Sequence, residues 1–268
     1  MAAKSRKAVN TFLFENLSHL KGVQHFISTR NGGVSKPPFD TLNLSFNVSD
    51  DPKHVIENRK LLADALGFNI ESLTMAKQVH GNKVATIEKK MRGKGAHDHA
   101  SALDAIDAMV TNIPDILLMI QVADCVPLLF YDPMQRVIAA AHAGWRGTAL
   151  KIAQNTVNTM VKRYKSDPRY IYVGIGPSIG PCCYEVGHEV IQEMARNLKN
   201  SKGLIISRDG KMHLDLWEAN KRQLIEAGLS ASNIETAGIC THCNKETFFS
   251  SRAGKGITGR FGAGIKIS

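Results

Sequence analysis

Apolar and polar positions follow two different periods along this chain, one typical of strands and one typical of helices. Short apolar runs predict strands at residues 23–29, 84–87, 108–111, 117–123, 137–141 and 171–175. Helical spacing of apolar residues predicts helices at residues 51–67, 148–164, 187–198 and 215–227. Because strands alternate with helices, the pattern predicts the α/β class.

The pattern further predicts a single layered α/β domain with a mixed β-sheet core flanked by helices. Several strands lie too close in sequence for the helical crossover that a parallel pair needs. The runs 117–123 and 137–141 are apolar on both faces, as in strands that are covered on both sides. Since no repeat or linker divides the chain, we expect an N-terminal extension at 1–20 and one domain at 21–268.

The charge balance indicates an anionic partner. The net charge is +10, from 34 Lys and Arg against 24 Asp and Glu. These basic residues are scattered, and no aromatic signature of RNA binding accompanies them. A small-molecule anion is therefore favoured, and we expect no nucleic-acid partner.

The cysteines and the apolar runs indicate in which cellular compartment the protein is expected. An odd number of cysteines, five, with two crowded pairs makes a poor disulfide framework in a chain of this length. The N-terminal region lacks the apolar core of a signal peptide, and no apolar run is long enough to cross a bilayer. We therefore expect a cytoplasmic protein with no membrane partner, either a monomer or a small homo-oligomer.

Three segments place a metal-binding side chain beside a predicted strand. His80 lies in QVHG at 78–81, Cys125 in ADCVP at 123–127 and His142 in AHAGWRG at 141–147. Two imidazoles and a thiolate suit Zn²⁺ and leave its fourth position open, as in catalytic sites. Two alternatives stay open at this point. Cys125 can act as a nucleophile with His142 as its base and no metal, or these residues can be ordinary core residues.

Five segments in fixed order carry a family resemblance. They are ISTRNGGVS at 27–35, QVHG, ADCVP, HAGWRG at 142–147 and GPSIGPCCYEVG at 176–187. Together they resemble the YfiH-like family, also called the laccase-domain or peptidoglycan editing factor family, from about Gly22 to Gly264. The resemblance implies a single α/β domain with zinc at His80, Cys125 and His142.

The resemblance also implies activities. The first is phosphorolysis of purine nucleosides, namely adenosine, inosine, guanosine and methylthioadenosine, and it is accompanied by adenosine deamination. The implied partners are thus a purine nucleoside and phosphate. The alternatives are a copper-dependent polyphenol oxidase, which is the older family label, and a factor that edits peptidoglycan precursors.

The histidine content argues against a multicopper centre. Such centres are built mainly from imidazoles in several H-x-H pairs, whereas this chain has ten His and one such pair, His97 and His99. Copper could still bind the single His/His/Cys set. We therefore expect zinc, with copper as the alternative metal, and rank the phosphorylase and deaminase activities above the oxidase.

Five further residues are candidates for the reaction. Arg30, before a Gly-Gly turn, and Arg146, at a strand-to-helix turn, are placed to bind phosphate, unless they are surface arginines. Asn43 falls in a family-like motif, although turn capping explains it equally well. Gln78 is a further candidate for substrate binding. Asp124 could shuttle a proton or orient a metal ligand.

Two glycine- or cysteine-rich segments are set aside. Residues 174–180 contain the glycines of a dinucleotide loop at the wrong spacing. Cys240 and Cys243 form a C-x-x-C without a partner pair at zinc-ribbon spacing, which favours a structural turn. The vicinal Cys182 and Cys183 belong to the family motif and are expected to pack near the site.

Overall fold

Six α-helices form in the part of the chain that the computed structural model describes, residues 8–198 and 201–268. They are α1 (Glu15–Ser18), α2 (Pro52–Leu66), α3 (Trp145–Ala149), α4 (Ile152–Tyr164), α5 (His188–Asn197) and α6 (Leu216–Glu226). The predicted helix at 148–164 is divided between α3 and α4, since Lys151 adopts a left-handed conformation with φ 62°. Short 3₁₀ helices occur at Ile70–Ser72, Lys89–Met91, Pro168–Tyr170 and Ala231–Asn233.

The strands form two large sheets and a hairpin. The five-stranded sheet has the order β1 (Thr11–Phe12), β2 (Val23–Ser28), β13 (Phe261–Ile267), β6 (Leu117–Val122) and β3 (Leu73–Thr74). The six-stranded sheet has the order β12 (Ile234–Thr236), β9 (Tyr172–Ile175), β7 (Val126–Asp132), β8 (Val137–Ala143), β5 (Ala108–Thr111) and β4 (Val84–Thr86). The hairpin pairs β10 (Ile205–Arg208) with β11 (Lys211–Leu214).

Both large sheets are mixed, because β3–β6, β4–β5 and β9–β12 are parallel pairs and the other pairs are antiparallel. The predicted α/β class with mixed sheets and flanking helices is confirmed. The strands are divided between two sheets. The predicted runs correspond to β2, β4, β5, β6, β8 and β9, whereas the long strands β7 and β13 and the shorter β1, β3, β10, β11 and β12 were not predicted. The β13 sequence is rich in glycine because its neighbours are close: a Cβ on Gly264 would lie 2.5 Å from the Phe26 ring.

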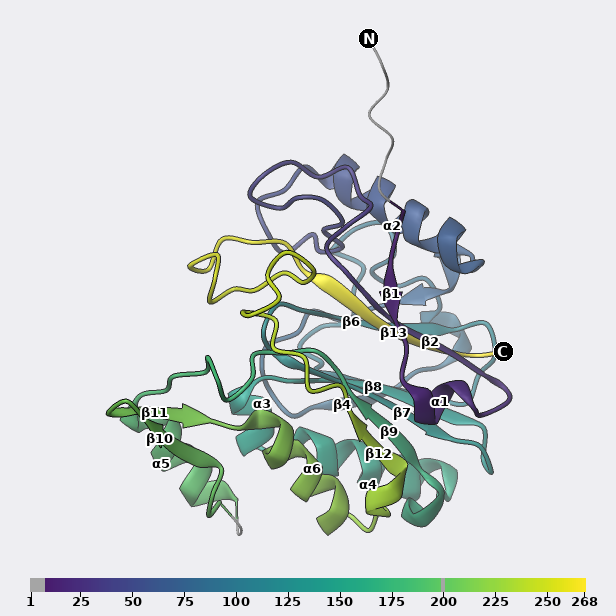
Figure 1. Cartoon of the computed structure of the whole chain (residues 1–268). Coiled ribbons are helices and arrows are strands. Elements are labelled where there is room, and N and C mark those ends of the chain that lie inside the picture. The colour runs from purple at the N-terminus through teal and green to yellow at the C-terminus, as the bar shows by residue number, and fades with distance from the viewer. Residues whose placement is uncertain (1–7, 199–200) are drawn as a thin grey trace.

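The layers stack in the order helix, sheet, sheet, helices (Figure 1). Helix α2 packs on the outer face of the five-stranded sheet through Leu62 and Ala63. The inner faces of the two sheets enclose a core that includes Ile120, Leu129 and Ile265. Helices α3, α4 and α6 cover the other face of the six-stranded sheet. Strands β6 and β8 are therefore covered on both faces, as the apolar runs at 117–123 and 137–141 predict.

The described part of the expected N-terminal extension packs on this core. Strand β1 pairs with β2, and Phe14 and Leu17 beside it are fully buried. The backbone N–H of Asn16 donates to Glu235 Oε2 at 2.7 Å. Residues 1–7 lie outside the described residues.

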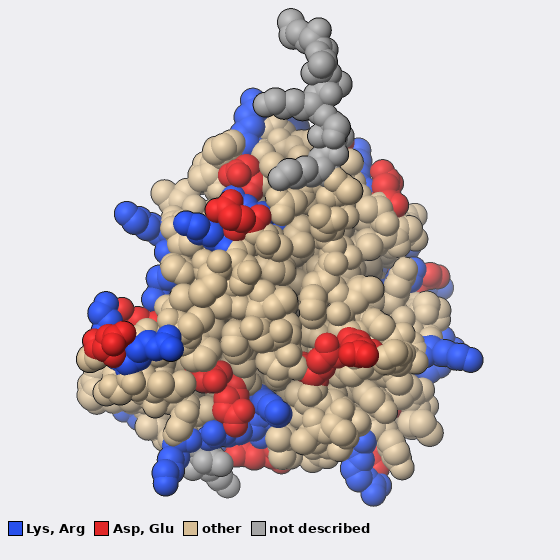
Figure 2. All heavy atoms as spheres, viewed as in Figure 1, with Lys and Arg blue, Asp and Glu red and all other residues tan. Residues whose placement is uncertain are grey.

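The surface carries mixed charge. On the face shown in Figure 2, Lys and Arg are interspersed with Asp and Glu and do not gather in one patch. In the described ranges, no helix combines the length and the apolar character needed to cross a membrane.

Candidate metal centre and adjoining cavity

The link between β6 and β7 positions the centre. Strand β6 belongs to the five-stranded sheet and β7 to the six-stranded sheet, so the chain crosses between sheets at residues 123–125. Asp124 makes this crossing with φ 87°, and Cys125 follows it. His142 lies opposite Pro127 on the paired strand β8. His80 arrives from the loop between β3 and β4, with φ 60°.

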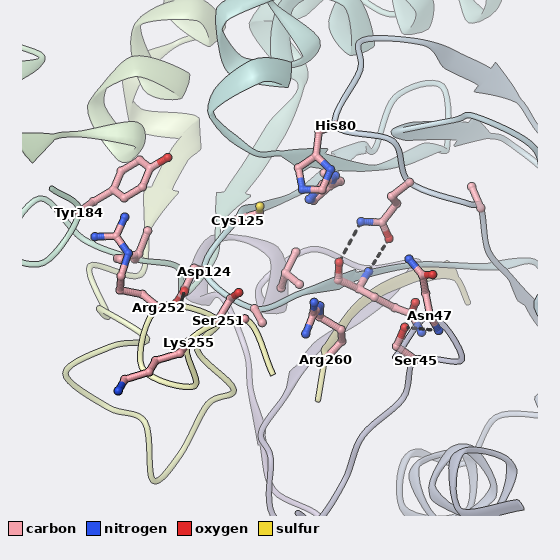
Figure 3. A pocket seen from close by; sticks show the side chains of 18 of the residues that line it. Ser45, Asn47, His80, Asp124, Cys125, Tyr184, Ser251, Arg252, Lys255 and Arg260 are labelled. Atoms are coloured by element: carbon pink, nitrogen blue, oxygen red, sulfur yellow. Dashed lines mark hydrogen bonds between the residues drawn. The ribbon is translucent and has the colours of Figure 1, made fainter. Parts of the chain in front are cut away.

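The structure brings His80, Cys125 and His142 together. One ligand atom from each lies within 4.8 Å of the other two, and the imidazole centroids are 4.7 Å apart. His142 is buried, Cys125 half-buried and His80 exposed, so one side of the group opens outward (Figure 3).

A buried carboxylate, Asp107, orients both histidines. Its Oδ1 accepts hydrogen bonds from His142 Nδ1 and from the backbone N–H of His80, both at 2.9 Å. Its Oδ2 accepts from the backbone N–H of Gly81 at 2.7 Å. Because a carboxylate only accepts, His142 carries its proton on Nδ1 and directs Nε2 to the centre. Asp107 was not among the residues predicted from the sequence, although it is a carboxylate immediately before the strand predicted at 108–111.

Cys125 and His142 form an ion pair when no metal is present. Burial would raise the pKa of the Cys125 thiol, but the charge of His142 and the hydrogen bonds from both histidines lower it to about 6. Burial would lower the pKa of His142, but Cys125 and Asp107 raise it to about 9. The resulting thiolate suits both a metal ligand and a metal-free nucleophile.

The donor set fits a zinc ion. It comprises one thiolate sulfur and two imidazole nitrogens, the combination found in three-ligand catalytic zinc sites. The bond from His142 Nδ1 to Asp107 is the outer contact that such histidine ligands make. A Cβ on Gly144 would lie 3.0 Å from His80 and 3.1 Å from Cys125 Sγ, so glycine there keeps the ligands unobstructed.

A cavity of about 570 Å³ adjoins the three side chains. Ser45 and Asn47 lie on one side of it, and Tyr184 and Arg252 lie on the other (Figure 3). This volume and this mixed lining are those of a small-molecule site.

Three cationic side chains line the cavity, namely Arg252, Lys255 and Arg260. Arg260 is largely buried, which lowers its pKa, and its guanidinium donates to the carbonyls of Thr258 at 2.7 Å and Gly259 at 3.0 Å. Sequence analysis missed all three, because they lie in a segment with no recognised motif.

Three of the predicted residues border or support this cavity. Gln78 lines it and exchanges two 2.8 Å hydrogen bonds with the Gln121 backbone. Asp124 also lines it, but its carboxylate accepts from Thr241 Oγ1 and from the Arg252 backbone, both at 2.6 Å. Asn43 is fully buried, and its Oδ1 accepts from the Arg260 backbone at 2.9 Å.

The two predicted arginines lie elsewhere. The Arg30 guanidinium donates to the carbonyls of Asp40 at 2.9 Å and Lys245 at 2.7 Å, in a separate cavity. Arg146 borders a second cavity of about 400 Å³ that shares His80 and Cys125 with the first. It lies over the Trp145 ring, with its side chain 57% exposed.

Comparison with known proteins shows which family this chain belongs to. The family model described as multi-copper polyphenol oxidoreductase laccase matches residues 24–268. A protein of Geobacillus stearothermophilus named purine nucleoside phosphorylase YlmD is 41% identical over 236 residues, which cover 87% of this chain and 86% of that protein. This chain belongs to the YfiH/YlmD family.

A solved structure and one further relative extend the comparison. The crystal structure of YlmD from Geobacillus stearothermophilus superimposes with a TM-score of 0.92 at 37% identity, over 99% of this chain and 98% of the other. A protein from an unknown prokaryote named adenosine deaminase RL5 is 34% identical, over 87% of this chain and 89% of that protein. The family predicted from the motifs is confirmed.

Proposed function

We propose that this chain is a zinc-dependent purine nucleoside phosphorylase, acting on adenosine, inosine, guanosine and methylthioadenosine, with adenosine deaminase activity. One observation carries the proposal: the His80, Cys125 and His142 group opens onto a cavity that also holds three cationic side chains. A nucleoside needs the cavity, and phosphate needs the cations. The names of the relatives support the same two activities.

Phosphorolysis makes one bond to the ribose and breaks another. A phosphate oxygen bonds to C1′, and the C1′–N9 bond breaks with its electron pair passing to the purine, which takes up the proton that the hydrogen phosphate gives up. We assign phosphate binding to Arg252, Lys255 and Arg260, because each lines the cavity. Ser45 and Asn47 on the facing wall are then placed to hydrogen-bond the nucleoside.

Deamination forms a bond from a water oxygen to C6 of adenosine, breaks the bond from C6 to the amino nitrogen, and releases ammonia. When bound, a zinc ion supplies a Lewis acid and lowers the pKa of a water molecule. Asp107 fixes the orientation of two of the ligands. The protein thereby holds the reacting groups in place before the substrate arrives.

The remaining predicted residues receive narrower roles. Asn43 positions Arg260 by accepting a hydrogen bond from the Arg260 backbone N–H. Asp124 positions Arg252 in the same way, through the Arg252 backbone N–H. Gln78 holds the Gln121 backbone at the cavity wall. Arg146 is kept as an anion-binding candidate because it borders the second cavity beside His80. Arg30 lies in a separate cavity that shares no residue with the metal-binding group. We therefore assign phosphate binding to the cationic side chains of the first cavity and not to Arg30.

A copper-dependent polyphenol oxidase is the second candidate. It is favoured by the His/His/Cys donor set, which copper also binds, and by the description of the matching family model.

A factor that binds peptidoglycan precursors without catalysis is the third candidate. In that case the metal is purely structural.

The test compares the wild-type protein with Cys125→Ser. Both are loaded with zinc, given inosine or adenosine with phosphate, and assayed for free base and for inosine formed from adenosine. We expect the wild type to form both products and Cys125→Ser to lose at least 100-fold in rate, as with other removed catalytic groups. A wild type that is inactive with zinc but oxidises phenols with copper would favour the second candidate, and one inactive with both metals would favour the third.

A further inference from the structure

Four cysteines outside the site described above meet at one point. One atom from each of Cys182, Cys183, Cys240 and Cys243 lies within 4.8 Å of the other three sulfur atoms. In the sequence they form two separate pairs, because Cys182 and Cys243 are 61 residues apart. The fold brings the pairs together through Ser178, which forms a parallel bridge with Cys240.

We propose that Cys182, Cys183, Cys240 and Cys243 form a tetrathiolate site for a single zinc ion, which links two walls of the cavity. The proposal concerns metal binding and does not depend on the reaction catalysed nearby. Four thiols exchange four protons for one Zn²⁺, which leaves a site of net charge −2.

The distances between the sulfur atoms fit one tetrahedral ion. A Zn–S bond is about 2.3 Å long, so the tetrahedral edge between two sulfurs is about 3.8 Å. Cys182 Sγ and Cys243 Sγ are 3.7 Å apart, and Cys183 Sγ and Cys243 Sγ are 3.4 Å apart. An iron–sulfur cluster places several ions between its cysteines, whereas this group has room for one.

The backbone also supports a thiolate here. The N–H of Gly180 donates to Cys240 Sγ at 3.3 Å. Cys240 and Cys243 lie in one turn, in which the N–H of Asn244 donates to the Cys240 carbonyl at 3.0 Å. Such C-x-x-C turns are the usual half-site of structural zinc.

Disulfides account for the arrangement less well. A disulfide joins two sulfurs and gives no reason for the other two to approach. Here each sulfur lies near all three others.

The ion would hold two loops that line the reaction cavity. Cys182 and Cys183 are followed by Tyr184, which lines the cavity from the loop after β9. Cys240 and Cys243 belong to the segment between β12 and β13, which also carries Arg252. The Arg252 guanidinium reaches back to the carbonyls of Cys183 at 3.4 Å and Glu185 at 3.1 Å. The same two walls are thus already joined by hydrogen bonds.

Metal analysis of matched variants tests the proposal. Each protein is loaded with zinc under reducing conditions, dialysed and analysed for zinc per chain. We expect two zinc ions in the wild type, one in His80→Ala/Cys125→Ser, one in Cys243→Ser, and none in the combined variant. Cys182→Ser, at an exposed position, serves as a second variant should Cys243→Ser fail to fold.

The double variant His80→Ala/Cys125→Ser isolates the proposed site, so its result is independent of enzymatic activity. X-ray absorption at its zinc edge should show four sulfur neighbours at about 2.3 Å, and removing the zinc should lower its unfolding temperature. A double variant that retains no zinc, zinc with nitrogen or oxygen neighbours, or a disulfide among these cysteines in protein purified under reducing conditions would overturn the proposal.

Discussion

Asp107 is the side chain on which the geometry of the centre depends most. Its two oxygens accept hydrogen bonds from His142 Nδ1 and from the backbone of His80 and Gly81. It is 1% exposed, and these hydrogen bonds hold its pKa below the usual value although burial acts to raise it. It therefore carries a negative charge next to the metal ligands.

Replacing Asp107 by Asn should weaken zinc binding at the centre about 10- to 100-fold, as removal of an outer partner of a ligand typically does. The amide keeps one acceptor and loses the charge. Competition with a chromophoric chelator measures the affinity. Asp104→Asn is the matched control, since Asp104 is exposed and pairs with Lys77. Equal affinity in the two variants would show that Asp107 does not support the centre.

Arg260→Gln should raise the KM for phosphate about 10- to 100-fold, because a charge-assisted hydrogen bond to an anion contributes roughly 1.5–3 kcal/mol. The KM for inosine should change less. Steady-state kinetics with each substrate varied in turn gives both values. Arg163→Gln on the surface of α4 is the control for loss of an arginine. A phosphate KM that stays at the wild-type value would remove Arg260 from the assignment.

The residues found from the sequence and those missed differ in one respect. His80, Cys125 and His142 lie in motifs that stand beside predicted strands, so local pattern and residue type revealed them. Asp107 and Arg260 have no local signature, and their roles come from contacts between segments distant in sequence. The sequence shows the four cysteines as two pairs. Their proximity in space results from the folding of the loops after β9 and β12, which the sequence pattern does not reveal.

Among the elements, strands were harder to delimit than helices. The apolar run of β6 continues into β7, and only the positive φ of Asp124 separates them. The sequence showed a buried strand there and could not show that the chain leaves one sheet for the other. That crossing places Cys125 between the last residue of β6 in one sheet and the first residue of β7 in the other.

The contact between β2 and the segment before α1 should make stability depend on pH. His25 on β2 is 6% exposed, and its Nε2 accepts from the backbone N–H of Phe14 at 2.8 Å. Burial lowers the pKa of His25 from 6.5 to about 4. Between these values the unfolded chain binds the proton more readily. The free energy of unfolding should therefore fall by up to roughly 3 kcal/mol as the pH drops from 6.5 to 4.

His25→Gln provides the control, because glutamine can accept the same hydrogen bond and does not titrate. Urea unfolding of both proteins between pH 7 and pH 4 gives the two pH profiles. The wild type should lose more stability than the variant over this range. Parallel profiles would mean that His25 is not protonated on unfolding.

In the molecule as a whole, the core between the two sheets supports the crossing that carries Cys125. Ile120 on β6 is 2% exposed within this core. Ile120→Ala should lower the free energy of unfolding by about 2–5 kcal/mol, through lost burial and the cavity left behind. Ile225→Ala, at a 43% exposed position of α6, should change it by less than about 0.5 kcal/mol. Urea unfolding separates the two, and similar losses would show that the sheets are not held by this core.

The dependence of base release on phosphate tests the proposed reaction most directly. Zinc-loaded protein is incubated with inosine and phosphate, and ³¹P spectroscopy follows the phosphate while chromatography follows hypoxanthine. We predict ribose 1-phosphate in equal amount to hypoxanthine, and no hypoxanthine when phosphate is left out. Hypoxanthine released at the same rate without phosphate, or no release under either condition, would contradict phosphorolysis at this centre.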